Sequence, residues 1–182
     1  MYVGIDQALG HTGFSVLDDA GELVSLAVIV PAPRTGAERL GYIRDQLELL
    51  LPPTTKVAAL EGYSYDSVGR VFELGEIGGV VRVLLHDLGV ETLIVAPASL
   101  KKFVTGSAQA TKQMMRMTTY TKWGLDIDSD DACDAHGLSR IAWLYEHADQ
   151  SCHRNEVEVI NRLKNPTEKP PPPARSKIKL TV

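Results

Sequence analysis

Three short apolar segments open this sequence in quick succession, and an alternation of strand and helix follows them. The segments predicted as strands cover residues 2–6, 13–17, 22–30, 56–60 and 91–96. The Asp18-Asp19-Ala20-Gly21 stretch is typical of a tight turn between the second and third strands, so the first three should form an antiparallel meander. The fourth and fifth are each reached through a predicted helix, a connection that normally gives parallel pairing.

The predicted helices cover about residues 35–50, 68–88, 107–123 and 130–147, and Pro97 opens a further short helix or turn. Thr35 and Glu38 have the spacing of a capping box at the start of the first helix. Gly75, Gly78 and Gly79 predict a close packing partner for the second helix, possibly across a two-fold axis. The fold class is therefore α/β, with a mixed five-stranded sheet flanked by helices.

The chain length of 182 residues suits one domain. We expect a domain over residues 1–163 and a flexible, Pro-rich basic tail over residues 164–182. No apolar run reaches the roughly 20 residues of a membrane span, and the N-terminus lacks a secretory signal. Cys133 and Cys152 lack metal-ligand spacing. These features predict a soluble protein of the cytosol, bacterial or phage-infected, with two free thiols.

Four acidic residues occupy positions from which they can converge. Asp6 and Glu61 each follow an apolar strand, and Asp131 and Asp134 lie three residues apart at the start of a predicted helix. Functional groups gather at the carboxyl ends of parallel strands, and helix residues three apart share a face. Taken singly, Asp6 could be a turn residue and Asp131 a helix cap. The strand order nevertheless predicts one convergence point for all four.

Closely packed carboxylates repel each other unless cations or protons neutralise them. Their hard oxygen ligands suit Mg²⁺, with Mn²⁺ as a substitute. Two such ions per site can activate water, orient a phosphodiester and stabilise the leaving oxygen. In this interpretation Asp6 bridges both ions, and Glu61, Asp131 and Asp134 complete the ligand set.

Basic residues follow the fifth strand, although the net charge of −4 is unusual for a protein that binds nucleic acid. The candidates for phosphate contact are Lys101, Lys102, Lys112 and Arg116. A solvated helix face is the alternative for this set. We interpret Asp126, Asp128 and Asp130 as solvated loop charges because they precede the last predicted helix. Truncation after about Asn165 should weaken DNA affinity and its salt dependence, and unchanged salt slopes would reject this role for the basic tail.

At these residues the sequence resembles the RuvC family of Holliday-junction resolvases. The matching blocks, in the family's order over about residues 2–145, are Val3-Gly-Ile-Asp6, His11-Thr-Gly13, Ala59-Leu-Glu61, Ala96-Pro97 with Ser99-Leu-Lys101, Gly106-Ser-Ala with Lys112, and Asp131-Ala-Cys-Asp134-Ala. The resemblance implies an RNase H-like fold, a homodimer with two active sites, and paired nicks that resolve a four-way junction. It also makes Asp6, Glu61, Asp131 and Asp134 the metal-binding acids, and Lys101 and Lys112 the residues that approach the DNA backbone.

The chain would be a divergent or phage-type member, and two departures from the family's pattern bear on junction and sequence preference more than on hydrolysis. Gln7-Ala8 stand where the family usually has Pro-Gly after its first acid. Where many members have a Phe three residues after the second acid, this chain has Ser64 between Tyr63 and Tyr65. Either tyrosine could stack on unpaired bases as a wedge or lie in the core.

Three other functions stay open at this stage. A hairpin with Gly4-Ile-Asp6 and Thr12-Gly13 also resembles the phosphate-binding element of actin-like and sugar kinases, although those enzymes use two domains and this chain supplies one. A nuclease of the same fold could act on flaps, forks or RNA–DNA hybrids. A non-catalytic DNA-binding module would show no stabilisation by metal ions.

Overall fold

The computed structural model describes residues 1–62, 71–150 and 153–166. Its five strands are β1 (Tyr2–Asp6), β2 (Thr12–Leu17), β3 (Leu23–Ile29), β4 (Val57–Glu61) and β5 (Glu91–Val95). The helices are α1 (Gly36–Leu50), α2 (Val71–Asp87), α3 (Pro97–Thr105), α4 (Lys112–Trp123), α5 (Asp130–Glu146) and α6 (Arg154–Lys164), with a 3₁₀ turn at Ala148–Gln150. In these residues no helix is long and apolar enough to cross a membrane.

The strands form one sheet in the order β3-β2-β1-β4-β5. β1, β2 and β3 pair antiparallel, whereas β1 with β4 and β4 with β5 pair parallel. The predicted mixed sheet is therefore confirmed. Because β1 and β4 run in the same direction, Asp6 and Glu61 end neighbouring strands at the same edge of the sheet.

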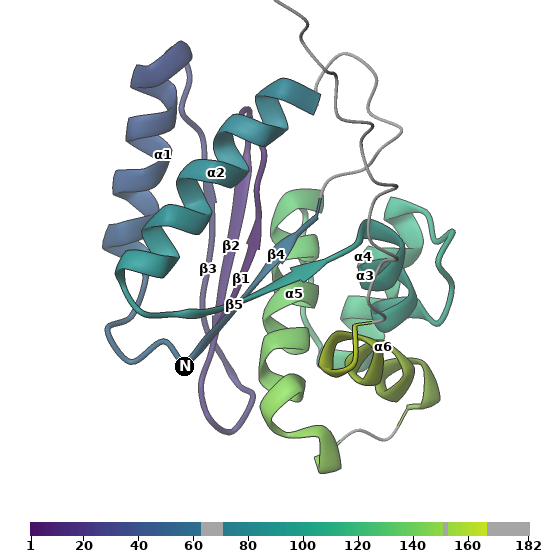
Figure 1. Ribbon diagram of the computed structural model, residues 1–182. Helices are drawn as coiled ribbons and strands as arrows, with labels where there is room; N and C mark the ends of the chain where they lie inside the picture. The colour runs from purple at the N-terminus through teal and green to yellow at the C-terminus, as the bar shows by residue number, and fades with distance from the viewer. Residues whose placement is uncertain (63–70, 151–152, 167–182) are drawn as a thin grey trace, which may run out of the picture.

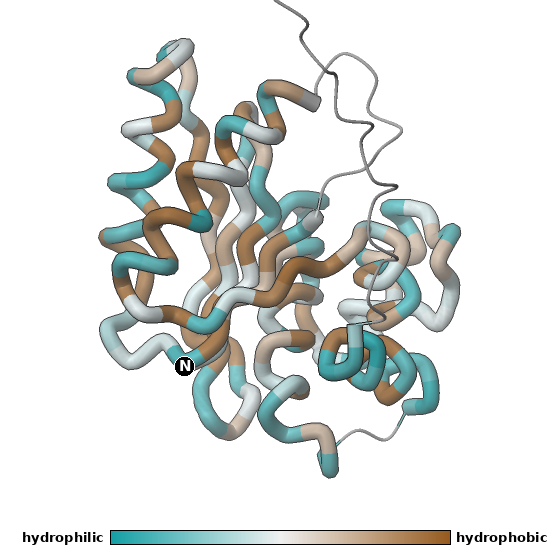
Figure 2. Tube along the Cα trace, in the orientation of Figure 1, coloured by the Kyte–Doolittle hydropathy of each residue, from teal (hydrophilic) through white to brown (hydrophobic). Residues whose placement is uncertain are grey.

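Helices cover both faces of the sheet (Figure 1). α1 and α2 lie on one face, where Ile43 and Ile77 join an apolar cluster with Val3 and Ile5. α5 lies on the other face with α3, α4 and α6 around it. In Figure 2 the strands are mostly brown or white, while the helices alternate between brown and teal along their turns. This is the pattern of amphipathic helices packed on a buried sheet.

α5 is the central helix of the fold, since eleven of its seventeen residues are buried. Its backbone lies directly against β1 and β2 at two glycines. A Cβ atom on Gly4 would come within 2.0 Å of the Ala135 carbonyl oxygen, and one on Gly13 within 2.0 Å of the Asp131 carbonyl oxygen. Only glycine leaves room for this approach. The contact brings the first turns of α5 to the strand edge that carries Asp6.

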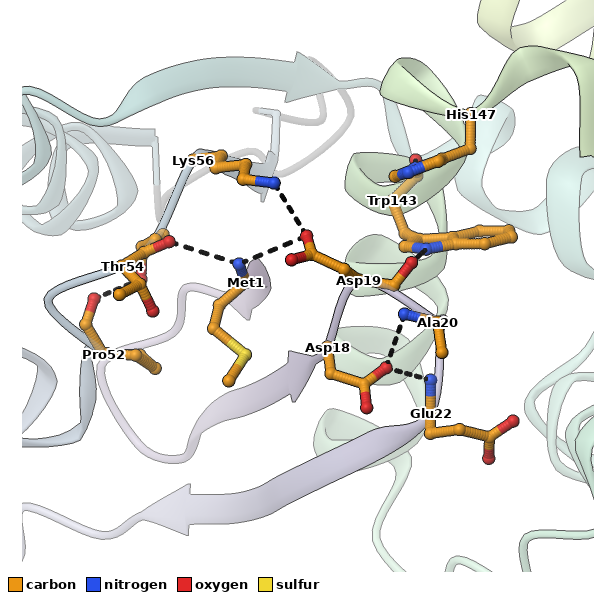
Figure 3. A network of polar contacts seen from close by, with 11 residues as sticks. Met1, Asp18, Asp19, Ala20, Glu22, Pro52, Thr54, Lys56, Trp143 and His147 are labelled. Atoms are coloured by element: carbon orange, nitrogen blue, oxygen red, sulfur yellow. Dashed lines mark hydrogen bonds and ion pairs between the residues drawn. The ribbon is translucent and has the colours of Figure 1, made fainter.

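A polar network fixes the opposite edge of the sheet (Figure 3). Asp19, in the turn between β2 and β3, accepts a hydrogen bond of 2.8 Å from the Lys56 ammonium group. The Trp143 indole on α5 donates to the Asp19 carbonyl oxygen at 3.2 Å. The meander, the start of β4 and the last turns of α5 are thereby joined at one place.

Local details differ from the prediction at three helices. Thr35 is the N-cap of α1, but its side chain makes no capping bond, so the predicted capping box is wrong; Glu38 pairs with Arg34 at 3.9 Å instead. α4 begins at Lys112 rather than near residue 107, because the Thr111 hydroxyl caps it by accepting from the Met114 N–H. α6 was not predicted; it packs on α3, where the Asn155 amide donates to the Phe103 carbonyl oxygen.

Candidate active site

The four predicted acids lie close enough together for the charges of Glu61, Asp131 and Asp134 all to act on Asp6. Asp6 and Glu61 come from the ends of β1 and β4, and Asp131 and Asp134 from the first two turns of α5. Asp6 is only 7% exposed, and the other three are half-buried. Ser129, whose hydroxyl accepts from the Ala132 N–H at 3.3 Å, is the N-cap of α5. Neither Asp130 nor Asp131 is therefore needed as the helix cap.

The pKa values of three acids show the electrostatic strain of this convergence. Burial, followed by the charges of Glu61, Asp134 and Asp131, raises the pKa of Asp6 well above its usual value. Burial also raises the pKa of Glu61, although a hydrogen bond shared with Asp6 and the charge of Lys101 act against it. Burial and then the charge of Glu61 raise the pKa of Asp134 to about 7. Near neutral pH the site therefore retains protons that ordinary carboxyl groups have lost.

The chemistry of this ligand set fits divalent cations. Hard cations such as Mg²⁺ bind carboxylate oxygens, and they displace any protons that the carboxyl groups carry. Across the residues the structure describes, no set of three acids, histidines or cysteines already has the spacing of a formed metal site. The four carboxyl groups are thus near enough to interact through their charges, but they do not have the spacing of ligands around one ion.

Basic side chains lie beside the acids. The charge of Lys101 on α3 partly offsets the rise in the pKa of Glu61. The charge of Lys112 on α4 does the same for Asp134. Lys112 also pairs with Asp130 at 3.0 Å and keeps 75% of its side chain exposed. Arg116 lies 3.9 Å from the same carboxylate. Asp130 is thus the first residue of α5 and an ion-pair partner of α4, not the solvated loop charge that was predicted.

Lys102 and the two tyrosines have different outcomes. The Lys102 ammonium group pairs with Glu158 of α6, so the structure does not join it to the acids. Tyr63 and Tyr65 lie outside the described residues, and a wedge at these positions stays a prediction. Cys133 is a free, buried thiol beside the Thr119 hydroxyl, as predicted, while Cys152 also lies outside the described residues.

Sequence reasoning missed the residues that position these acids. Gly4 and Gly13 admit α5, and Gln7 joins β1 to β4 through a hydrogen bond from its amide to the Glu61 carbonyl oxygen. A glycine inside a strand is a known sign of close backbone approach, so the first two had a signal in the sequence. Gln7 had only its departure from the Pro-Gly of the resemblance.

The sheet order, the helical layers and the acids at the strand edge define an RNase H-like fold with a carboxylate site. A family model described as crossover junction endodeoxyribonuclease RuvC matches residues 2–139. The chain belongs to this family of nucleases.

Curated relatives with that name include one from Bordetella parapertussis, 31% identical over 178 residues, covering 90% of this chain and 96% of the relative. Another, from Anaeromyxobacter, is 32% identical over 143 residues, covering 75% of this chain and 69% of the relative. RuvC from Thermus thermophilus superposes with a TM-score of 0.67 at 23% identity, over 80% of this chain and 95% of that one. The same enzyme solved with a Holliday junction substrate gives 0.66 at 23% identity, over 82% and 96% of the two chains.

Proposed function

We propose that this protein is a structure-selective endodeoxyribonuclease that resolves four-way DNA junctions by metal-dependent hydrolysis. The observation that carries the proposal is the convergence of Asp6, Glu61, Asp131 and Asp134, with raised pKa values at three of them. Membership in a family of crossover junction endodeoxyribonucleases supports the substrate. We also propose that the protein acts in the bacterial cytosol or in a phage-infected cell, where such a DNA substrate would be found.

In this proposal the four acids hold two Mg²⁺ ions, for which Mn²⁺ substitutes. Bound ions of this kind activate water and stabilise the leaving oxygen of a phosphodiester. Asp6 is the acid on which the charges of all three others act, so it would contribute a ligand at the centre of the set. Because the pKa of Asp134 is raised to about 7, this residue would have to release a proton to act as a ligand near neutral pH.

Lys101 and Lys112 are the residues suited to meet the DNA backbone. Both are close enough to the acids for their charges to shift the pKa of a neighbouring carboxyl group. A phosphate placed between the acids and these lysines would be held by their charge while the reacting bond faces the carboxylates. Arg116 extends the same basic side of α4, whereas Lys102 is engaged by Glu158.

We further propose a homodimer formed through α2. A Cβ atom on Gly75 or Gly79 would meet nothing within 4 Å, so the close packing partner predicted for these glycines is not another element of the described chain. The glycines line a cleft of about 640 Å³ between α1 and α2, and Val83 beside them is 61% exposed. Val83→Asp should give a monomer in sedimentation velocity, while Val24→Asp, at a 54% exposed position on β3, should leave the dimer intact.

The test of function is cleavage of a labelled panel with Mg²⁺, Mn²⁺ or EDTA. The panel contains a four-way junction, a fork, a flap, a linear duplex and an RNA–DNA hybrid. Symmetric, metal-dependent nicks in the junction are the expected result. Preferential cutting of another substrate would keep the chemistry and replace the substrate, and cleavage of none with any metal would leave a DNA-binding module.

A further inference from the structure

Gln7 follows Asp6 directly and is buried, with 7% of its surface exposed. Its side-chain amide donates a hydrogen bond of 2.8 Å to the backbone carbonyl oxygen of Glu61. The backbone register between β1 and β4 ends at Ile5 and Leu60. The side chain of Gln7 therefore continues the connection between the two strands just where Asp6 and Glu61 leave them.

The end of β4 is held from its other side as well. The Gly62 N–H donates to the Val95 carbonyl oxygen of β5 at 2.7 Å. The peptide group between Glu61 and Gly62 thus accepts a hydrogen bond from the Gln7 side chain, just past β1, and donates one to Val95 of β5. Both act on the residue whose carboxyl group shares a hydrogen bond with Asp6, so the bond from Gln7 fixes the spacing of two acids.

The other polar atom of the Gln7 side chain has no partner. Its Oε1 atom is buried and accepts no hydrogen bond from any residue that the structure describes. Buried amide oxygens in folded proteins are nearly always paired, with protein or with ordered water. An open acceptor on a side chain that already contacts the Glu61 backbone suits a donor that arrives with the cations, namely a water molecule of their hydration shell, since Mg²⁺ usually keeps several waters.

We propose that Gln7 is a positioning residue of the metal site: its amide nitrogen fixes Glu61 relative to Asp6, and its Oε1 accepts a hydrogen bond from cation-bound water. This inference rests on the proposed metal-dependent function and deepens it. Partners of this kind, one step removed from the metal, typically change metal affinity or activity by about 10- to 100-fold when they are replaced.

The test uses the full chain and two readouts, the melting temperature titrated with MgCl₂ without DNA, and the kinetics of junction cleavage. Gln7→Met has a similar shape and removes both hydrogen-bonding atoms. It should raise the Mg²⁺ concentration that gives half of the stabilisation by about tenfold and lower kcat at an unchanged KM for the junction. Gln46→Met in α1 makes the same exchange in the helical layer on the other face and should match the wild type in both readouts.

Gln7→Glu separates the two atoms, because it keeps an oxygen acceptor and loses the donor. At pH 8 this variant should bind Mg²⁺ at least as tightly as the wild type, since it adds a carboxylate. Its kcat should still be below that of the wild type, because Glu61 is no longer held. Wild-type Mg²⁺ affinity and kcat in Gln7→Met would overturn the inference, as would a raised KM with unchanged kcat. A wild-type protein that Mg²⁺ does not stabilise would instead overturn the proposed function, which separates the two failures.

Discussion

Gly13 on β2 lies against the backbone of Asp131, the first of the two acids that α5 contributes to the proposed metal site. A Cβ atom at position 13 would stand 2.0 Å from the Asp131 carbonyl oxygen, so α5 has to move if glycine is replaced. Gly13→Ala should destabilise the fold by roughly 1–3 kcal/mol and reduce cleavage by displacing Asp131 and Asp134. Urea unfolding and single-turnover cleavage measure the two effects. Gly10→Ala, where a Cβ meets nothing within 4 Å, is the matched control; equal effects at both positions would contradict the contact.

Asp6→Asn should abolish cleavage while junction binding is retained or improved. The charges of the other three acids all act on Asp6, so the substitution relieves repulsion as it removes a cation ligand. Gel-shift binding in Ca²⁺ and cleavage in Mg²⁺ measure the two properties. Asp149→Asn, at an exposed position, should leave both unchanged. Normal turnover of Asp6→Asn would be incompatible with the assigned site.

Asp134 should contribute stability to the metal-free protein that is lost as the pH rises from about 4 to about 7, because burial and then the charge of Glu61 raise the pKa of Asp134 from 3.8 to about 7. The folded state keeps a proton that the unfolded chain releases, so this stabilisation is complete below the unfolded pKa and is lost as the pH passes the folded one. Urea midpoints in EDTA across this range measure it. Asp134→Asn removes this contribution, so the stability of the wild type relative to Asp134→Asn should fall as the pH rises, and a difference that rises with pH would refute the assignment.

Lys112 and Lys102 should differ in their contribution to DNA binding. Each lysine has an acidic partner, but Lys112 is 75% exposed and pairs with Asp130 at the start of α5, where its charge also acts on Asp134, whereas Lys102 pairs with Glu158 of α6. Lys112→Gln should weaken junction binding for all sequences and reduce the slope of log affinity against log salt by about 1. Lys102→Gln should leave the slope unchanged. Fluorescence anisotropy with a labelled junction over a series of salt concentrations tests both, and equal slopes in the two variants would contradict this division.

The acids could be found from the sequence because strand order alone places the ends of β1 and β4 at one edge. What the sequence did not reveal depends on contacts between distant segments. Gln7 acquires its role only when Glu61 lies in the adjacent parallel strand, and nothing local marks that bond. α6 was missed because only a few of its residues are apolar, among them the buried Val159 and Ile160, and most of the others are charged or polar. One of the charged residues, Glu156, is buried and pairs with Lys122 at 2.8 Å.

The distribution of the acids along the chain has a consequence for synthesis on the ribosome. Asp6 and Glu61 emerge early, but their partners lie on α5, which ends at Glu146 and closes the sheet through Gly4 and Gly13. A nascent chain or an amino-terminal fragment therefore carries half of the proposed cation site and lacks the helix that covers one face of its sheet. If the four acids are the active site, this nuclease should gain its activity only when its translation is nearly finished.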